Sequence, residues 1–148
     1  MIQRIQSLYL FIVFAAYVAL FFLPVVSFQT NDLLYDFGNL VSSSGANIKV
    51  YPYMVAILIA MPCIVFVTIF LFKKRILQIR MTTIALLINV LYVGALFFVI
   101  DSIENKLAIS PVYEAGIYVS LIPLVFLVLA SRAIRKDEKM VRSSDRLR

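Results

Sequence analysis

Residue types that perform chemistry in proteins are scarce in this chain of 148 residues. It has no histidine, which is the commonest general base and metal ligand. Its single cysteine, Cys63, lies in an apolar run beside Pro62, where a thiol usually acts as a small apolar side chain. The sequence also has no glycine-rich loop of the kind that binds phosphate groups. We therefore expect a protein that is not an enzyme and that uses neither a metal ion nor a cofactor.

One polar side chain stands out within the apolar stretches. Asn89 lies between Ile88 and Val90, deep in an uncharged segment. A lone amide in such a setting typically makes a hydrogen bond that fixes helix packing, and we prefer this interpretation. The alternative is a small transporter or lipid-handling protein, whose ligand would occupy a crevice near Asn89 that Pro62 and Pro123 open.

Basic residues gather in three regions: the N-terminus with Arg4, the segment 73–80, and the tail 131–148. These regions hold 12 of the 14 Lys and Arg residues. We expect the basic residues of the last two regions to bind a partner. The residues concerned are Lys73, Lys74, Arg75, Arg80, Arg132, Arg135, Lys136, Lys139, Arg142 and Arg146.

The tail narrows the choice of partner. It has no glycine or proline, so the last helix is expected to continue into it. Its basic residues are accompanied by Asp137, Glu138 and Asp145, which tails that only adhere to anionic phospholipids seldom retain. We therefore favour a protein partner, in a membrane assembly or in the cytoplasm, over anionic phospholipids alone. RNA, including that of the ribosome, and a second copy of the chain are the remaining alternatives.

Four long uncharged stretches must position these residues. They cover about residues 8–28, 53–72, 81–100 and 112–130, and each approaches the ~20 residues that a helix needs to cross a membrane. Apolar residues make up 63% of the chain, against roughly 45–50% in soluble domains. Because unpaired backbone groups are too costly in lipid, the sequence predicts an all-α membrane protein, a single domain built as a four-transmembrane-helix bundle.

The distribution of charge predicts the orientation of this bundle. The three basic regions all fall on one side of a four-span topology, whereas the two loops on the other side contain only Lys49 and Lys106 as basic residues. Lys and Arg accumulate in cytoplasmic loops of membrane proteins. We therefore expect both termini to lie in the cytoplasm, with the tail as a cytoplasmic helical extension of the fourth helix.

The two outer loops differ in character. In the first, strand-like runs at residues 33–37 and 48–51 flank a Ser/Gly/Asn-rich centre at 42–47, which predicts a small hairpin. The second loop is expected to form a short interfacial helix or turn that begins at Ser102 and is broken at Pro111.

The two ends of the chain also carry a resemblance. The opening MIQRIQSLYL and the closing segment from LASRAIRKDEK to Arg148 are similar to an uncharacterised family of four-span inner-membrane proteins from Bacteroidetes. The resemblance implies a bacterial inner membrane, with the outer loops facing the periplasm. That family has no established activity, so it transfers no catalytic residue. It further implies that both termini and the segment 73–80 form one cytoplasmic surface, through which an accessory or scaffold subunit would dock.

Overall fold

The computed structural model describes residues 3–30, 33–37, 52–107 and 110–145, and its architecture is dominated by four helices. In chain order the elements are α1 (Gln3–Leu20), β1 (Val26–Thr30), β2 (Leu33–Phe37), α2 (Pro52–Phe70), the 3-10 turn η1 (Leu71–Lys73), α3 (Arg75–Leu107), β3 (Pro111–Tyr113) and α4 (Ala115–Asp145). The predicted helical fold class is confirmed. So is the continuation of the fourth helix into the tail, since α4 runs unbroken to Asp145.

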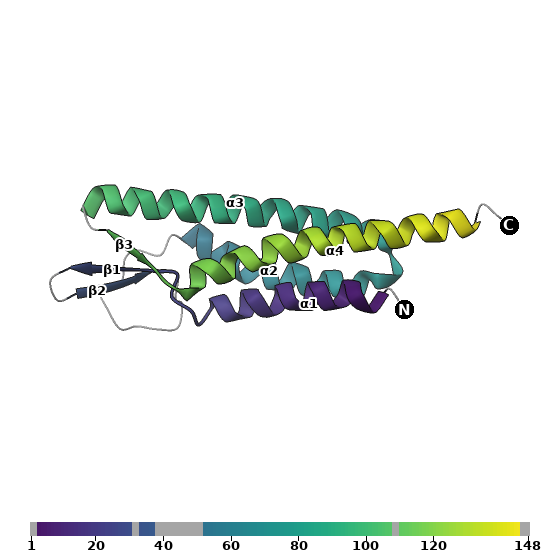
Figure 1. Cartoon of the computed structure of the whole chain (residues 1–148), viewed down its shortest axis with the longest axis horizontal. Coiled ribbons are helices and arrows are strands. Elements are labelled where there is room, and N and C mark those ends of the chain that lie inside the picture. The colour runs from purple at the N-terminus through teal and green to yellow at the C-terminus, as the bar shows by residue number, and fades with distance from the viewer. Residues whose placement is uncertain (1–2, 31–32, 38–51, 108–109, 146–148) are drawn as a thin grey trace.

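The helices lie side by side with their long axes aligned (Figure 1). The main contacts join α1 to α2 and α4, and join α3 to the same two helices, so α1 and α3 occupy opposite corners of the bundle. Tyr17, Met61 and Leu127, from three different helices, are fully buried in one core cluster. A second cluster, with Leu96 and Ile117 among its members, lies where the bundle meets the strands.

The outer surface of the bundle is strongly apolar. Phe11, Leu91 and Phe98 are among many large apolar side chains that face outward. A water-soluble bundle would carry polar residues on these faces. α3 and α4 are long enough and apolar enough to cross a membrane, while the apolar parts of α1 and α2 are shorter.

The first apolar stretch is not helical throughout, which corrects the predicted span of residues 8–28. α1 ends at Leu20, and the chain then turns, with the amide of Phe22 donating to the carbonyl oxygen of Ala19. Pro24 follows, and its ring cannot continue a helix because it has no amide hydrogen. Val26 then begins β1, consistent with the preference of β-branched residues for strands.

The three strands form an antiparallel sheet in the order β2-β1-β3, at the end of the bundle away from the two chain termini (Figure 1). Val26 pairs with Phe37 on one side and with Tyr113 on the other. The predicted strand at 33–37 is therefore present as β2, and it pairs with β1. The second predicted run at 48–51 and the predicted turn at 42–47 lie outside the described residues.

The connection between the third and fourth stretches also differs from the prediction. α3 continues to Leu107, so Ser102 is not an N-cap; its hydroxyl donates to the carbonyl oxygen of Phe98 within the helix. The break predicted at Pro111 is real, but Pro111 begins β3. α4 starts at Ala115, so the predicted span of 112–130 began three residues too early. α3 continues past Asp101, where its predicted span ended. The Asp101 carboxylate accepts a hydrogen bond from the Asn105 side chain one turn later, which supports this additional helical segment.

Candidate partner-binding surface

The basic regions predicted from the sequence meet at one end of the bundle. The beginning of α1, the connection between α2 and α3, and the last part of α4 all lie there (Figure 1). Gln6 Nε2 donates to the carbonyl oxygen of Ala133 at 3.2 Å, which ties α1 to α4. Arg75 Nη1 lies 2.9 Å from Asp137 Oδ2, which ties α3 to α4. These contacts hold residues 131–137 against the bundle, and the rest of α4 extends beyond the other helices (Figure 1).

The last part of α4 has two distinct faces. Ser131, Ile134 and Asp137 are buried, and their spacing of three residues places them on the side facing the bundle. Arg132, Lys136 and Lys139 are exposed, and their spacing of four and three residues places them together on another side. We call these three residues the basic stripe.

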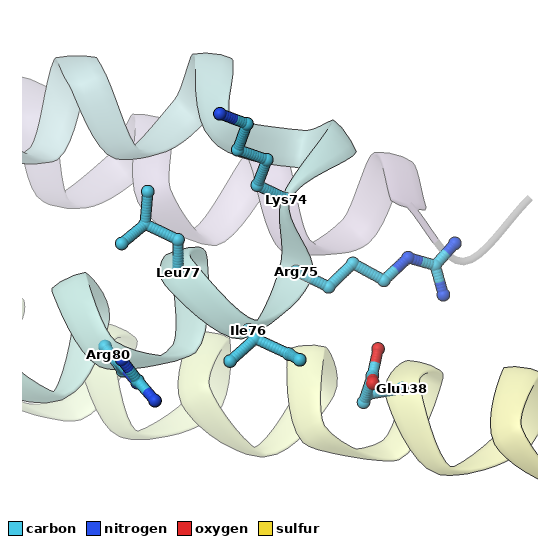
Figure 2. Close-up of a pocket in the computed structure, with 6 residues that line it drawn as sticks. All are labelled: Lys74, Arg75, Ile76, Leu77, Arg80 and Glu138. Carbon is cyan, nitrogen blue, oxygen red and sulfur yellow. The ribbon is translucent and has the colours of Figure 1, made fainter.

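The start of α3 forms the second part of this surface. Lys74, Arg75, Ile76, Leu77, Arg80 and Glu138 line an open pocket of about 430 Å³, which we call the junction pocket (Figure 2). Arg75 is held within it by the contact to Asp137, and it also reaches the Asp137 carbonyl oxygen at 3.5 Å. The side chains of Lys74 and Arg80 have no ion-pair partner among the described residues.

The structure thus divides the ten predicted residues into groups with different environments. Arg132, Lys136 and Lys139 form the basic stripe, Lys74 and Arg80 line the junction pocket, and Arg75 forms an ion pair. Arg135 is exposed, and its Nη2 lies 3.5 Å from Thr83 Oγ1. The side chains of Lys73 and Arg142, and the whole of Arg146, lie outside the described part of the structure.

Sequence reasoning missed the residues that anchor the last part of α4. Asp137 was treated only as one of three acids in a basic tail, although its carboxylate is the partner of Arg75. A signal was present, because Asp137 lies three residues after Ile134 and so shares the buried face of the helix. Gln6 carried no comparable signal, since its partner is a backbone oxygen 127 residues away.

Asn89 lies in a packed contact and not at a surface opening. Its side chain is fully buried, and its Oδ1 accepts a 2.9 Å hydrogen bond from the Tyr17 hydroxyl. This bond joins α1 to α3 across the middle of the bundle. The Asn89 Nδ2 has no partner among the described residues. The open pocket beside Pro62 is lined by Phe14, Cys63 and Phe66, and Asn89 is not part of it.

Two substitutions distinguish packing from ligand binding at this contact. Asn89→Leu fills similar space and removes the unpaired Nδ2, but it leaves the buried Tyr17 hydroxyl without its acceptor, so it should cost about 1 kcal/mol. Tyr17→Phe leaves the whole buried amide unpaired and should cost about 1–3 kcal/mol. Thermal unfolding of both variants in mild detergent measures the difference. If Asn89→Leu instead abolishes the native phenotype at unchanged stability, the crevice hypothesis is correct.

Glu114, just before α4, has structural partners at the sheet. Glu114 Oε1 accepts a 2.9 Å bond from the Ser27 hydroxyl, and the Glu114 amide donates to the Val25 carbonyl oxygen. Within the described residues, no three His, Cys, Asp or Glu side chains are grouped so that they could hold a metal ion.

Comparisons with known proteins place the chain in a family. No curated protein and no solved structure matches it. A family described as Domain of unknown function (DUF4293) matches residues 2–147, which is nearly the whole chain. The match confirms the resemblance to an uncharacterised family, and the family's description assigns no activity. The chain therefore belongs to the family described as Domain of unknown function (DUF4293).

Proposed function

We propose that this protein is a non-enzymatic accessory subunit of a bacterial inner-membrane assembly, and that it docks an acidic protein partner through the basic stripe. In this proposal all four helices cross the membrane and both termini lie in the cytoplasm. α3 and α4 support it by their length and composition. α1 and α2 support it because they pack beside those two helices and also expose large apolar side chains, such as Phe11 and Phe66.

Charge supports the proposed orientation. The start of α3 and the last part of α4 lie at the end of the bundle that carries both termini (Figure 1), and their residues form the junction pocket and the basic stripe. The opposite end carries the sheet, with the exposed Asp101 nearby on α3. Concentration of Lys and Arg at one end is typical of the cytoplasmic side.

The observation that carries the docking proposal is the position of the basic stripe on an anchored helix. A helix rises 1.5 Å per residue, so Lys136 and Lys139 lie about 9 and 14 Å beyond Ala130, the last uncharged residue of the span. The headgroup layer of one leaflet is only about 5–8 Å thick. The stripe therefore extends into water, where an acidic protein surface can reach it. The Arg75–Asp137 ion pair fixes its direction before binding, which lowers the entropy cost of association.

The test compares two charge-matched variants of the full-length chain in its native host. Lys136→Gln/Lys139→Gln removes two positive charges from the basic stripe, and Lys74→Gln/Arg80→Gln removes two from the junction pocket. After mild detergent extraction, proteins that accompany each form are quantified by mass spectrometry. The stripe variant should retain a defined partner about tenfold less, the effect of about 1.4 kcal/mol from two exposed charge contacts. The pocket variant should retain it nearly as well as the unaltered chain.

Two further results decide the proposal. The captured partner should present an acidic surface, and its retention should fall as salt is raised, because exposed charge contacts are screened. If both variants retain the same proteins as the unaltered chain, docking through the basic stripe is wrong. If alkaline carbonate releases the protein from membranes, the proposed membrane integration is wrong.

A further inference from the structure

The junction pocket combines features that the basic stripe lacks. Its lining has exposed positive charge from Lys74 and Arg80 next to the apolar side chains of Ile76 and Leu77. Ile76 is about half exposed, although it lies in the most basic part of α3. A site for a protein carboxylate or for RNA needs no such apolar wall, whereas an anionic lipid presents a charged headgroup and an apolar body together.

The depth of the pocket matches the headgroup layer. In the proposed topology the third span begins at Met81, so Arg80 lies about 1.5 Å and Leu77 about 6 Å outside the hydrocarbon core. The headgroup layer of one leaflet is about 5–8 Å thick. Lys74 begins farther out, but Figure 2 shows its side chain turned back along the bundle, toward the level of Leu77 and Arg80. Long basic side chains commonly bend in this way at a membrane surface.

The two acids near the pocket leave this positive charge available. Asp137 is paired with Arg75, so these two charges offset each other. Glu138 already has an interaction partner within the protein. In Figure 2 its carboxylate lies beyond Ile76, on the side away from Arg80 and nearer the end with the termini. Figure 2 shows the Lys74 and Arg80 side chains on opposite sides of Leu77, with their charged ends pointing away from each other. Arg80 lies nearer the hydrocarbon core, so a phosphate group is placed most favourably at Arg80, and Lys74 can turn toward it because its side chain is long and exposed.

An apolar surface continues from the pocket along α3. Leu77, Ile84 and Leu91 are all exposed, and their spacing of seven residues places them on one face of the helix. Arg80 and Leu87 lie between them on the same face and are also exposed. From Leu77 to Leu91 this face spans about 21 Å, of which about 15 Å, from Met81 onward, lies within the ~30 Å hydrocarbon core. It offers acyl chains a continuous path below the charged pocket.

From this arrangement we infer that the junction pocket is a specific binding site for one anionic diacyl phospholipid, with its phosphate at Arg80, where Lys74 can reach it by turning inward, and its acyl chains along the α3 face. This inference rests on the membrane placement in the proposed function, and it is independent of the protein partner. It assigns separate roles to two groups of basic residues, lipid binding at the junction pocket and docking at the basic stripe.

Phosphatidylglycerol and phosphatidylcholine serve as the test lipids for the full-length purified chain. The chain is delipidated in detergent, each lipid is added back, and binding is measured by native mass spectrometry and by the shift in unfolding temperature. Phosphatidylglycerol should bind more tightly than phosphatidylcholine. Lys74→Gln/Arg80→Gln should weaken phosphatidylglycerol binding about 30-fold, whereas Lys136→Gln/Lys139→Gln should stay within about threefold of the unaltered chain. Lys74→Arg/Arg80→Lys keeps both charges and should retain the preference.

Several results would overturn the inference. Equal binding of the two lipids would do so, as would equal losses in the pocket and stripe variants. If inorganic phosphate alone stabilises the chain as much as phosphatidylglycerol, the site binds a free anion and not a lipid. Loss of lipid preference with the protein partner retained would refute only the lipid site. Retained lipid preference without a protein partner would refute only the docking proposal.

Discussion

Gly116→Ala is expected to destabilise the folded chain by about 2–4 kcal/mol, through overpacking and loss of a backbone hydrogen bond. A methyl group at this position would lie 2.5 Å from the Pro24 carbonyl oxygen and 3.1 Å from the Val25 Cα. Both neighbours are backbone atoms, so no side-chain rotation relieves the clash. The Gly116 amide also donates to the same Pro24 oxygen at 2.9 Å, a bond that would lengthen as the two segments separate.

Gly94→Ala is the matched control for this prediction. Gly94 lies within α3, and an added methyl group there has no atom within 4 Å. Alanine is favoured over glycine in helices by about 1 kcal/mol, so this variant should be as stable as the unaltered chain or slightly more stable. Denaturant unfolding in mild detergent, followed by circular dichroism, measures both. Equal stability of the two variants would show that the contact between α4 and Pro24 is not a tight one.

Arg75→Gln is expected to loosen the last part of α4 by about 2 kcal/mol. Removing one partner of a buried ion pair leaves the other charge uncompensated, which costs about 3–5 kcal/mol when the site is fully enclosed. The cost should be lower here because the Arg75 side chain is 24% exposed, although that of Asp137 is only 12% exposed. Asp137→Asn should cost less, about 1 kcal/mol, since the remaining Arg75 can turn toward water.

Hydrogen exchange of the amides of residues 131–145 measures this loosening directly. Exchange should accelerate most in Arg75→Gln, less in Asp137→Asn, and not at all in Lys136→Gln, which removes an exposed charge from the same helix. The double variant Arg75→Asp/Asp137→Arg restores opposite charges and should recover part of the protection. If Arg75→Gln exchanges at the rate of the unaltered chain, the hydrogen bond from Gln6 to Ala133 is enough to hold the helix.

The sequence allowed the four helices to be predicted because each contains a long uncharged segment, a property of neighbouring residues. Helix ends could not be predicted in the same way, since distant contacts fix them. The start of α4 depends on hydrogen bonds from Glu114 and Gly116 to Val25 and Pro24, about ninety residues earlier in the chain. β1 was missed because its first residues end a long uncharged run that predicts a helix, although VSFQT itself alternates apolar and polar residues as a strand does.

The candidate surface was predicted in its composition but not in its arrangement. Counting Lys and Arg identified the segments, whereas the division into a stripe and a pocket depends on how α3 and α4 are rotated against each other. That rotation places Asp137 inward and Lys136 outward, although the two residues are adjacent in the sequence. From a single sequence one can predict which residues share a face of a helix, but not which neighbouring helix that face contacts.

The order of the sheet, β2-β1-β3, has a consequence for the way the chain is made. Synthesis runs from the N-terminus, so β1 and β2 can pair as soon as both have emerged. β3 arrives only after all of α2 and α3, and until then β1 has one edge open. The last strand to be synthesised therefore completes the sheet, and pairing over such a separation is a slow step in folding. Premature termination before Pro111 would leave an open strand edge that favours aggregation, so that the sheet can close only once synthesis has passed Tyr113.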